Sequence, residues 1–225
     1  MSKKRVLINL LAFLLTVFIL ASSAALATTR EDAKLQYFRG INFGMNDKAI
    51  VEWQKVLTDF SDQREICADA QLQIGAAYKY MSRFDQAIVE FQKVVNDYPD
   101  QRYPRADALY YLGQLYQEKG DLSQAIAAFG SVVSEYSDMG WRAARAKLAM
   151  ARALDLSGQT DAALEALNGT VMGYSSVRSV CAEAAVEIGQ ILVSDNKKNY
   201  DQAIIQFSEV LNEYKDERAA CAQAL

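Results

Sequence analysis

Apolar side chains recur along most of the chain at a regular interval. Each copy of the pattern begins with an alanine, has a large apolar residue four positions later and ends with an aromatic residue eleven positions later. Offsets of 0, 4, 7 and 11 residues place side chains on one face of an α-helix, so each copy predicts an amphipathic helix. Four copies are spaced by 38 residues and a fifth follows after 40, starting at Ala49, Ala87, Ala125, Ala163 and Ala203.

The start of each of these helices is also predicted. A polar residue two positions before each alanine is a favoured N-cap, because its oxygen accepts a hydrogen bond from a first-turn N–H group. The predicted caps are Asp47, Asp85, Ser123, Asp161 and Asp201. Apolar residues precede three of these caps and predict hydrophobic staples onto the following turn. The predicted staple pairs are Phe84 with Val89, Leu122 with Ala127, and Tyr200 with Ile205.

A partner helix is predicted upstream of each amphipathic helix. A small residue recurs there with the same period, at Gly75, Gly113, Ala151 and Gly189. Glycine inside a helix costs about 1 kcal/mol relative to alanine, so its recurrence indicates a close approach of two helices. The sequence therefore predicts an all-α fold built from antiparallel helix–turn–helix hairpins. The predicted units are about 33–62, 68–101, 106–139, 143–176 and 181–216, with the start of a sixth at 219–225.

The order of residues within a unit resembles the tetratricopeptide repeat. The second unit carries Gly75, Tyr78, Ala87, Phe91 and Pro99 at the relative positions of that family. The resemblance implies a right-handed solenoid whose first helices line a concave groove that holds protein segments. The Tyr-Pro-Asp ending at 98–100 and the long period are similar to periplasmic members, such as the Tol-Pal system repeat protein and the outer-membrane β-barrel assembly lipoprotein. Unlike the Tol-Pal protein, this chain has no heptad coiled coil before the repeats, and unlike the assembly lipoprotein it has no cysteine near its signal cleavage site.

The resemblance also implies candidate partner-binding residues, carried over from the family's groove positions. They are Lys79, Tyr80, Tyr110, Gln114, Gln117, Arg145 and Arg152. Tyrosine and arginine are enriched in binding hot spots, which favours a protein partner. The alternative interpretation is that these side chains form an ordinary solvated helix face. The carboxylate clamp of chaperone-adaptor members is not expected, because its Lys and Asn positions hold Leu72, Ala76, Tyr110 and Gln114.

The first 27 residues have the pattern of an export signal. Lys3, Lys4 and Arg5 precede an apolar run over 6–20, and Ala25-Leu26-Ala27 fits the cleavage motif. The alternative is an uncleaved anchor, since the apolar run through Ala27 nearly reaches the length of a membrane-spanning helix. We expect cleavage after Ala27, which leaves a periplasmic repeat domain over 28–225 with no stable membrane span.

Composition limits the chemistry that the chain can perform. The sequence has no histidine, which excludes Ser-His-Asp and Cys-His catalysis and histidine-containing metal sites. A net charge of −4 disfavours nucleic-acid binding. We expect no catalytic residue, no metal and no cofactor. Cys67, Cys181 and Cys221 share one register and are predicted to be small packing residues, with a regulatory or intermolecular disulfide as the alternative.

The sequence therefore predicts an exported, non-enzymatic scaffold that binds a protein partner in the cell envelope. The alternative is the helical arm of a larger envelope enzyme, such as a peptidoglycan-cleaving one, with its catalytic domain beyond residue 225. Cys221-Ala222-Gln223-Ala224 repeats the opening of earlier first helices. We expect Ala203, Phe207 and Val210 to be left uncovered there, so that either the chain is a fragment or a partner or second copy caps this end.

Overall fold

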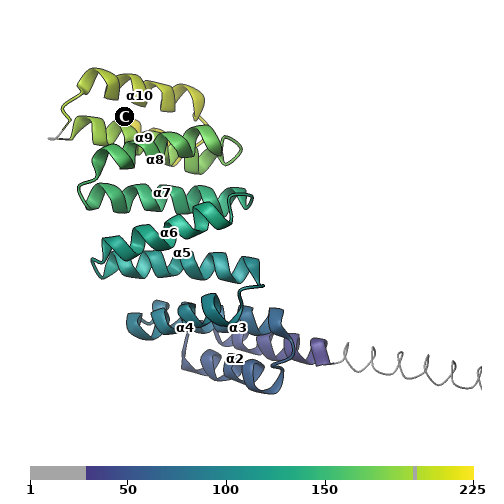
Figure 1. The fold of residues 1–225 in the computed structure, drawn as a ribbon. Helices are drawn as coiled ribbons and strands as arrows, with labels where there is room; N and C mark the ends of the chain where they lie inside the picture. The colour runs from purple at the N-terminus through teal and green to yellow at the C-terminus, as the bar shows by residue number, and fades with distance from the viewer. Residues whose placement is uncertain (1–28, 195–196) are drawn as a thin grey trace, which may run out of the picture. The chain divides into compact units, whose positions relative to one another are not determined.

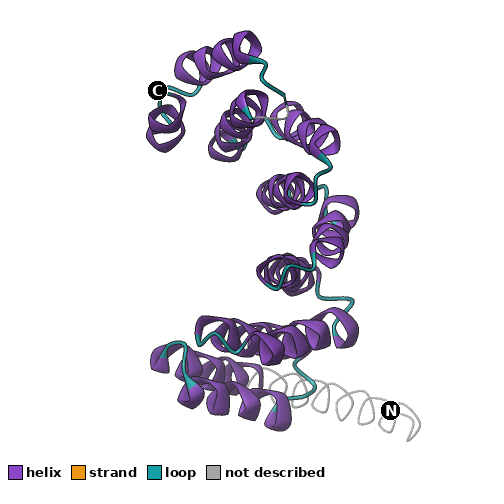
Figure 2. Cartoon of the chain, turned by 90° about the vertical axis from the view of Figure 1, so that its left-hand side faces the viewer, coloured by secondary structure: helices purple, strands orange, loops and turns teal. Residues whose placement is uncertain are grey.

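The computed structural model describes residues 29–194 and 197–225, and these form helices and turns with no strand among them (Figure 2). The predicted export signal over 1–27 lies outside the described residues. The chain divides into two compact units, Met1–Gln101 and Arg102–Leu225, and each is considered by itself. In the described part, no helix combines the length and the apolar character needed to cross a membrane.

The first unit contains two antiparallel hairpins. A helix over residues 29–43 pairs with α2 (Asp47–Asp59), and α3 (Arg64–Tyr80) pairs with α4 (Phe84–Asp97) (Figure 1). The core between them consists of fully buried apolar side chains, including Trp53, Val56 and Ile74. These residues fall on the predicted helix faces, so the apolar residues that recur every 38 positions are the residues that form this core.

The second unit continues the same alternation of helices. Its elements are α5 (Arg102–Glu118), α6 (Leu122–Glu135), α7 (Gly140–Leu156), α8 (Thr160–Gly173), α9 (Arg178–Val193), α10 (Tyr200–Glu213) and α11 (Arg218–Ala224) (Figure 1). Each helix packs on the next, and the first helices α5, α7, α9 and α11 also contact one another in sequence. The predicted all-α fold of repeated hairpins is confirmed.

The recurring small residue lies where the two helices of a hairpin come closest. A Cβ atom added at Gly75, Gly113 or Gly189 would lie 2.7, 2.5 or 2.4 Å from a ring carbon of the phenylalanine opposite. The three phenylalanines are Phe91, Phe129 and Phe207. No real Cβ contact is that short, so glycine is required wherever phenylalanine is present. In the fourth hairpin the small residue is Ala151, and the smaller Leu167 lies in the same core cluster.

A clamp between an arginine, an aspartate and a tyrosine recurs in three hairpins, and we call it the loop clamp. The arginine begins the first helix, the aspartate lies in the turn after the second helix, and the arginine lies over the tyrosine ring. The three sets are Arg64–Asp100–Tyr98, Arg102–Asp138–Tyr136 and Arg178–Asp216–Tyr214, with N–O distances of 2.5, 2.8 and 2.6 Å. The arginine lowers the pKa of the aspartate carboxyl in every set. The fourth hairpin has Gly140 and Ser176 at the arginine and aspartate positions.

The predicted helix caps are wrong by one or two residues. The N-caps are Asn46, Arg83, Asp121, Gln159 and Asn199, so the predicted residues Asp47, Asp85, Ser123, Asp161 and Asp201 lie inside the first turn. The side chains of Asn46, Asp121 and Asn199 accept first-turn N–H hydrogen bonds. The helix dipole favours an acidic residue inside the first turn. Aspartate is therefore common both there and at the N-cap, so the two positions look alike in the sequence.

The shifted register also removes the predicted staples. Phe84, Leu122 and Tyr200 are the first residues of their helices, not residues that precede a cap. Their predicted partners Val89 and Ile205 are 49% and 59% exposed. The turn before each second helix is instead set by a left-handed residue in a common register, at Gly44, Ser82, Gly120, Gly158 and Lys198. Glycine adopts this conformation without steric cost, which explains three of the five positions.

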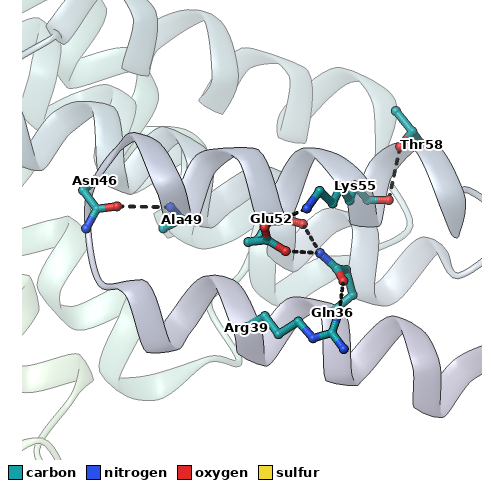
Figure 3. A network of polar contacts seen from close by, with 7 residues as sticks. All are labelled: Gln36, Arg39, Asn46, Ala49, Glu52, Lys55 and Thr58. Carbon is teal, nitrogen blue, oxygen red and sulfur yellow. Dashed lines mark hydrogen bonds and ion pairs between the residues drawn. The ribbon is translucent and has the colours of Figure 1, made fainter.

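Figure 3 shows how polar side chains close the first hairpin. Asn46 accepts a hydrogen bond from the N–H of Ala49 and so caps α2 (Figure 3). Gln36 is buried, and its amide nitrogen donates to the Glu52 carbonyl at 3.1 Å and to the Glu52 carboxylate at 2.6 Å (Figure 3). A buried amide needs such partners, because an unsatisfied polar group is costly in a core.

The three cysteines occupy equivalent positions at the start of first helices, and all three are free thiols. Each sulfur lies close to the carbonyl oxygen of the aromatic residue that ends the preceding helix. The distances are 3.2 Å from Cys67 to Phe60, 3.1 Å from Cys181 to Tyr174 and 3.2 Å from Cys221 to Tyr214. Burial raises the pKa of the Cys67 thiol to about 11. The buried environments of Cys67 and Cys181 favour the packing interpretation, because burial raises the pKa of both thiols and a protonated buried thiol is unreactive.

The expectation of an uncovered core at the end of α10 is wrong for two of the three residues named. Ala203 and Val210 are buried, with exposed fractions of 1% and 0%, and Phe207 is half-buried. The short helix α11 contacts both α9 and α10, and its Ala220 is buried against them. About two turns of an additional first helix therefore pack with Val210 of α10 in one buried cluster.

Candidate partner-binding groove

Three adjoining surface pockets run along the first helices of the second unit, and together we call them the α5–α9 groove. Their volumes are about 310, 290 and 390 Å³. The first and second pockets share Tyr110 and Gln114 in their walls. The second and third share Gln117, Arg152 and Leu156. Because each pocket shares wall residues with the next, the three form one continuous groove.

Aromatic side chains form the wall of the groove between α5 and α7. Tyr110 and Tyr111 meet edge to face, with ring centroids 6.1 Å apart, and Tyr110 also packs on Phe129 at 5.6 Å. Trp141, at the start of α7, is 54% exposed. The Arg145 guanidinium lies 5.0 Å from the Trp141 ring centroid, within the range of a cation–π contact. This end of the groove therefore offers a large apolar surface with a positive charge beside it.

An ion pair fixes the floor at the same end. Arg142 on α7 donates two hydrogen bonds to the Asp107 carboxylate on α5, at 2.6 and 3.1 Å. Both side chains are about one-third exposed. Two parallel hydrogen bonds hold a guanidinium and a carboxylate in one geometry. Burial raises the pKa of the neighbouring Tyr111, and the Asp107 charge adds to that effect. The tyrosine hydroxyl therefore remains protonated and able to donate.

A second ion-pair cluster lies toward α9. Arg152 on α7 donates to Glu187 at 2.6 Å and to Glu183 at 3.2 Å. Burial raises the pKa of the Glu187 carboxyl, although Arg152 opposes that shift. The long side chain of Arg152 thus joins α7 to α9 and is common to the second and third pockets. This end of the groove has more carboxylates than cations.

The structure brings together five of the seven residues carried over from the family. Tyr110, Gln114, Gln117, Arg145 and Arg152 all line the α5–α9 groove. The Gln114 amide donates to the Tyr110 hydroxyl at 3.3 Å, so the amide is oriented by its neighbour.

The other two candidates lie in the first unit. Lys79 and Tyr80 are the last two residues of α3, and Tyr80 is 75% exposed. They are not among the residues that line the three pockets of the groove. Both residues lie at the C-terminal end of α3.

Sequence reasoning missed three residues that shape the groove. Trp141, Tyr111 and Glu187 line it but are not among the positions carried over from the family. A signal was present for the first, because Trp141 follows the exposed Tyr103 by 38 residues and both are aromatic residues near the start of a first helix. The other two are recognisable only once the neighbouring helix is in place.

Comparisons with known proteins support the repeat class. Residues 69–100 and 107–138 match the family model of the tetratricopeptide repeat. These two segments, which are centred on the second and third predicted units, are therefore similar to tetratricopeptide repeats. No curated protein matches the chain in a sequence search.

Solved structures with a similar fold extend the likeness to most of the chain. MamA 41-end from Desulfovibrio magneticus RS-1 has a TM-score of 0.63 at 19% identity, over 82% of this chain and 96% of that chain. Another MamA crystal structure has a TM-score of 0.60 at 22% identity, over 77% and 91%. A Podosopora anserina putative kinesin light chain with nearly identical TPR-like repeats has a TM-score of 0.57 at 17% identity, over 86% and 94%. At these identities the likeness shows a shared tetratricopeptide-like solenoid fold.

The arrangement of the groove is suited to binding. Its charged side chains are paired or exposed, and the part of the chain that the structure describes has no group of three histidine, cysteine or carboxylate residues that could hold a metal ion. The features that remain are exposed aromatic rings, glutamine amides and an arginine beside a tryptophan. These are the features of a protein-interaction surface.

Proposed function

We propose that this protein is an exported, non-enzymatic repeat scaffold that binds a protein partner in the cell envelope through the α5–α9 groove. The observation that carries the proposal is the continuous line of pockets between first helices, with Tyr110, Trp141 and Arg145 in its wall. Tyrosine, tryptophan and arginine are the residues most enriched in binding hot spots. Proteins built from tetratricopeptide repeats are typically scaffolds without catalytic activity, which supports this function class.

Export is supported by the sequence of the N-terminal segment, in which a basic start, an apolar run and Ala25-Leu26-Ala27 follow one another. The periplasm is the compartment that this signal favours. N-terminal sequencing of protein from the envelope fraction tests this part. The sequence should begin at Thr28, and a mature protein that still begins at Met1 contradicts the proposed cleavage.

Site-specific photo-cross-linking in native cells tests the groove. A photoreactive phenylalanine analogue replaces Gln117, which lines two of the three pockets. The matched control carries the same analogue at Ser134, an exposed residue of α6 that lines none of them. We expect a discrete cross-linked band from position 117 and none from 134. Equal cross-linking from both positions, or none from 117, contradicts the proposal.

A further inference from the structure

We infer that the α5–α9 groove binds an extended protein segment that has an acidic side chain at the Trp141 end and a basic side chain toward Glu187. This inference rests on the proposed function, because it specifies what occupies the same groove. It follows from a difference in charge between the two ends of α7 and from the spacing between them.

The end near Trp141 has an excess of positive charge. Arg142 and Arg145 line this pocket together with one carboxylate, Asp107. Arg142 is already paired with that carboxylate. Arg145 is exposed, stacks on Trp141 and has no ion pair among the described residues. A stacked guanidinium keeps its N–H groups available at its edge, where they can form two parallel hydrogen bonds to a carboxylate.

The opposite end has an excess of negative charge. Glu118, Asp155 and Glu187 line the second and third pockets, with Arg152 as the cation. Arg152 is already shared between Glu187 and Glu183. Asp155 is exposed on the last turns of α7 and has no ion pair among the described residues. A lysine or arginine of a bound segment would therefore be attracted to this end.

The separation of the two ends sets the spacing of the two charges in the partner. Arg145 and Asp155 are ten residues apart on α7, which corresponds to about 15 Å along the helix axis at 1.5 Å per residue. An extended chain covers that distance in about four or five residues at 3.3 Å each. The acidic and basic residues of the partner should therefore be separated by three or four residues.

The groove between these ends favours an extended backbone over a helix. Gln114, Gln117 and Gln190 line successive pockets, and each has an amide group that can donate and accept hydrogen bonds. An extended segment has backbone N–H and C=O groups that need such partners, whereas a helix satisfies them internally. Tyr110, between the charged ends, offers an apolar contact for a side chain of the segment.

Fluorescein-labelled peptides test the inference by fluorescence anisotropy with the purified full chain. The peptides have Glu and Lys separated by three or four apolar residues, in both chain directions. Matched peptides have two Glu, two Lys or two Gln at the same positions. We expect one direction of the Glu and Lys peptide to bind about tenfold more tightly than each matched peptide, the ratio that corresponds to about 1.4 kcal/mol.

Arg145→Glu should weaken that binding about tenfold, and a peptide with Lys in place of its Glu should recover affinity for this variant. Arg218→Glu is the control, because Arg218 is an exposed arginine at the start of α11 and lines none of the three pockets. It makes the same change in net charge and should leave binding within about twofold. Circular dichroism melts of both variants establish that they are folded.

Several outcomes overturn the inference. One is binding that does not depend on the charges of the peptide, another is an equal loss in Arg145→Glu and Arg218→Glu, and a third is the absence of binding by any peptide. If photo-cross-linking from position 117 still yields a partner in these cases, the proposed function stands and only the charge pattern is wrong. If cross-linking also fails, the groove itself is not the binding surface.

Discussion

The third and fourth hairpins solve the same packing problem with different pairs of residues. In α5 and α6, Gly113 lies against Phe129, and a Cβ atom at the glycine would be 2.5 Å from the ring. In α7 and α8, the equivalent residues are Ala151 and Leu167, both buried in one cluster. The small residue is larger by one methyl group in the fourth hairpin, and the residue opposite is a leucine instead of the bulkier phenylalanine. The two positions therefore form a single unit of packing, in which the size of one residue depends on the size of the other.

The same two hairpins also differ in how charges connect them to their surroundings. The third has the loop clamp of Arg102, Asp138 and Tyr136, whereas the fourth has Gly140 and Ser176 at the first two positions. The fourth hairpin instead has ion pairs from α7 to α5 and from α7 to α9 on the side of the groove. Its arginines therefore connect neighbouring hairpins and line the α5–α9 groove.

The largest effect on stability is expected from overpacking the contact between Gly113 and Phe129 in the third hairpin. Gly113→Ala should lower the free energy of unfolding by about 1–3 kcal/mol, because its methyl group would overlap the Phe129 ring. Chemical denaturation of the purified chain measures this change. The double variant Gly113→Ala, Phe129→Leu recreates the pair of the fourth hairpin and should be more stable than the sum of the two single variants predicts.

Gly130→Ala provides the matched control in the same hairpin. Gly130 lies inside α6, and the nearest atom to an added Cβ is the Met150 sulfur at 3.8 Å, an ordinary contact. This variant should raise the free energy of unfolding by about 1 kcal/mol through helix propensity alone. If Gly113→Ala were also stabilising, the close approach of the two helices would be refuted.

An intermediate effect is expected at the start of α6. Asp121 caps this helix by accepting the N–H of Gln124 at 3.2 Å, so Asp121→Ala should cost about 1 kcal/mol of stability. Ser123→Ala, two residues inside the same helix, should cost less than half of that, because serine gains little over alanine there. Thermal melts of the two variants rank them. If Ser123→Ala were the more destabilising variant, Ser123 would be the cap, as the sequence pattern predicts.

A smaller effect is expected from transferring the loop clamp to the fourth hairpin. The double variant Gly140→Arg, Ser176→Asp places an arginine and an aspartate at the positions that Arg102 and Asp138 occupy one repeat earlier. Tyr174 is already present to stack on the arginine. The melting temperature should rise less than it does in Gly130→Ala, because exposed ion pairs stabilise weakly. A double-mutant cycle isolates the coupling, and a coupling of zero means that the clamp needs a feature specific to the other hairpins.

The smallest effect is expected from pH, which changes how much the loop clamps contribute to the stability of the fold. Arg102 holds the pKa of the Asp138 carboxyl below its ordinary value of 3.8. The clamp therefore stabilises the fold above about pH 4, and its contribution is lost as the pH falls through the lowered folded-state pKa. Carboxyl NMR titration should find Asp138 below 3.8 in the native chain and closer to 3.8 in Arg102→Ala. An unchanged titration in that variant contradicts the assignment of the shift to Arg102.

Much of the fold was predictable, because the hairpin core repeats one pattern of apolar residues. The buried alanine, the phenylalanine four residues later and the glycine opposite that ring follow directly from helical spacing. The cap positions were not predictable to the residue, since Asp121 and Ser123 are both favoured near a helix start and only the turn geometry separates them. The loop clamp had a signal in sequence, namely an arginine followed 36 or 38 residues later by an aspartate.

The candidate groove was predictable only in part. Tyr110, Gln114 and Arg145 follow from positions that the family uses, and the structure places them in one wall. The pairing of Arg142 with Asp107, and of Arg152 with Glu187, depends on how neighbouring first helices face each other. A single sequence does not fix that relation, because each arginine has several carboxylates at comparable sequence distances.

The two kinds of ion pair have different consequences for how repeats can be exchanged. Both partners of a loop clamp lie within one repeat period, as Arg102 and Asp138 do, so a duplicated or transplanted hairpin would bring its clamp with it. The pairs of Arg142 with Asp107 and of Arg152 with Glu187 join successive repeats. Moving the fourth hairpin elsewhere in the array would separate these partners. The cores of the hairpins are thus modular, whereas the ion pairs of Arg142 and Arg152 on α7 depend on the order of the hairpins.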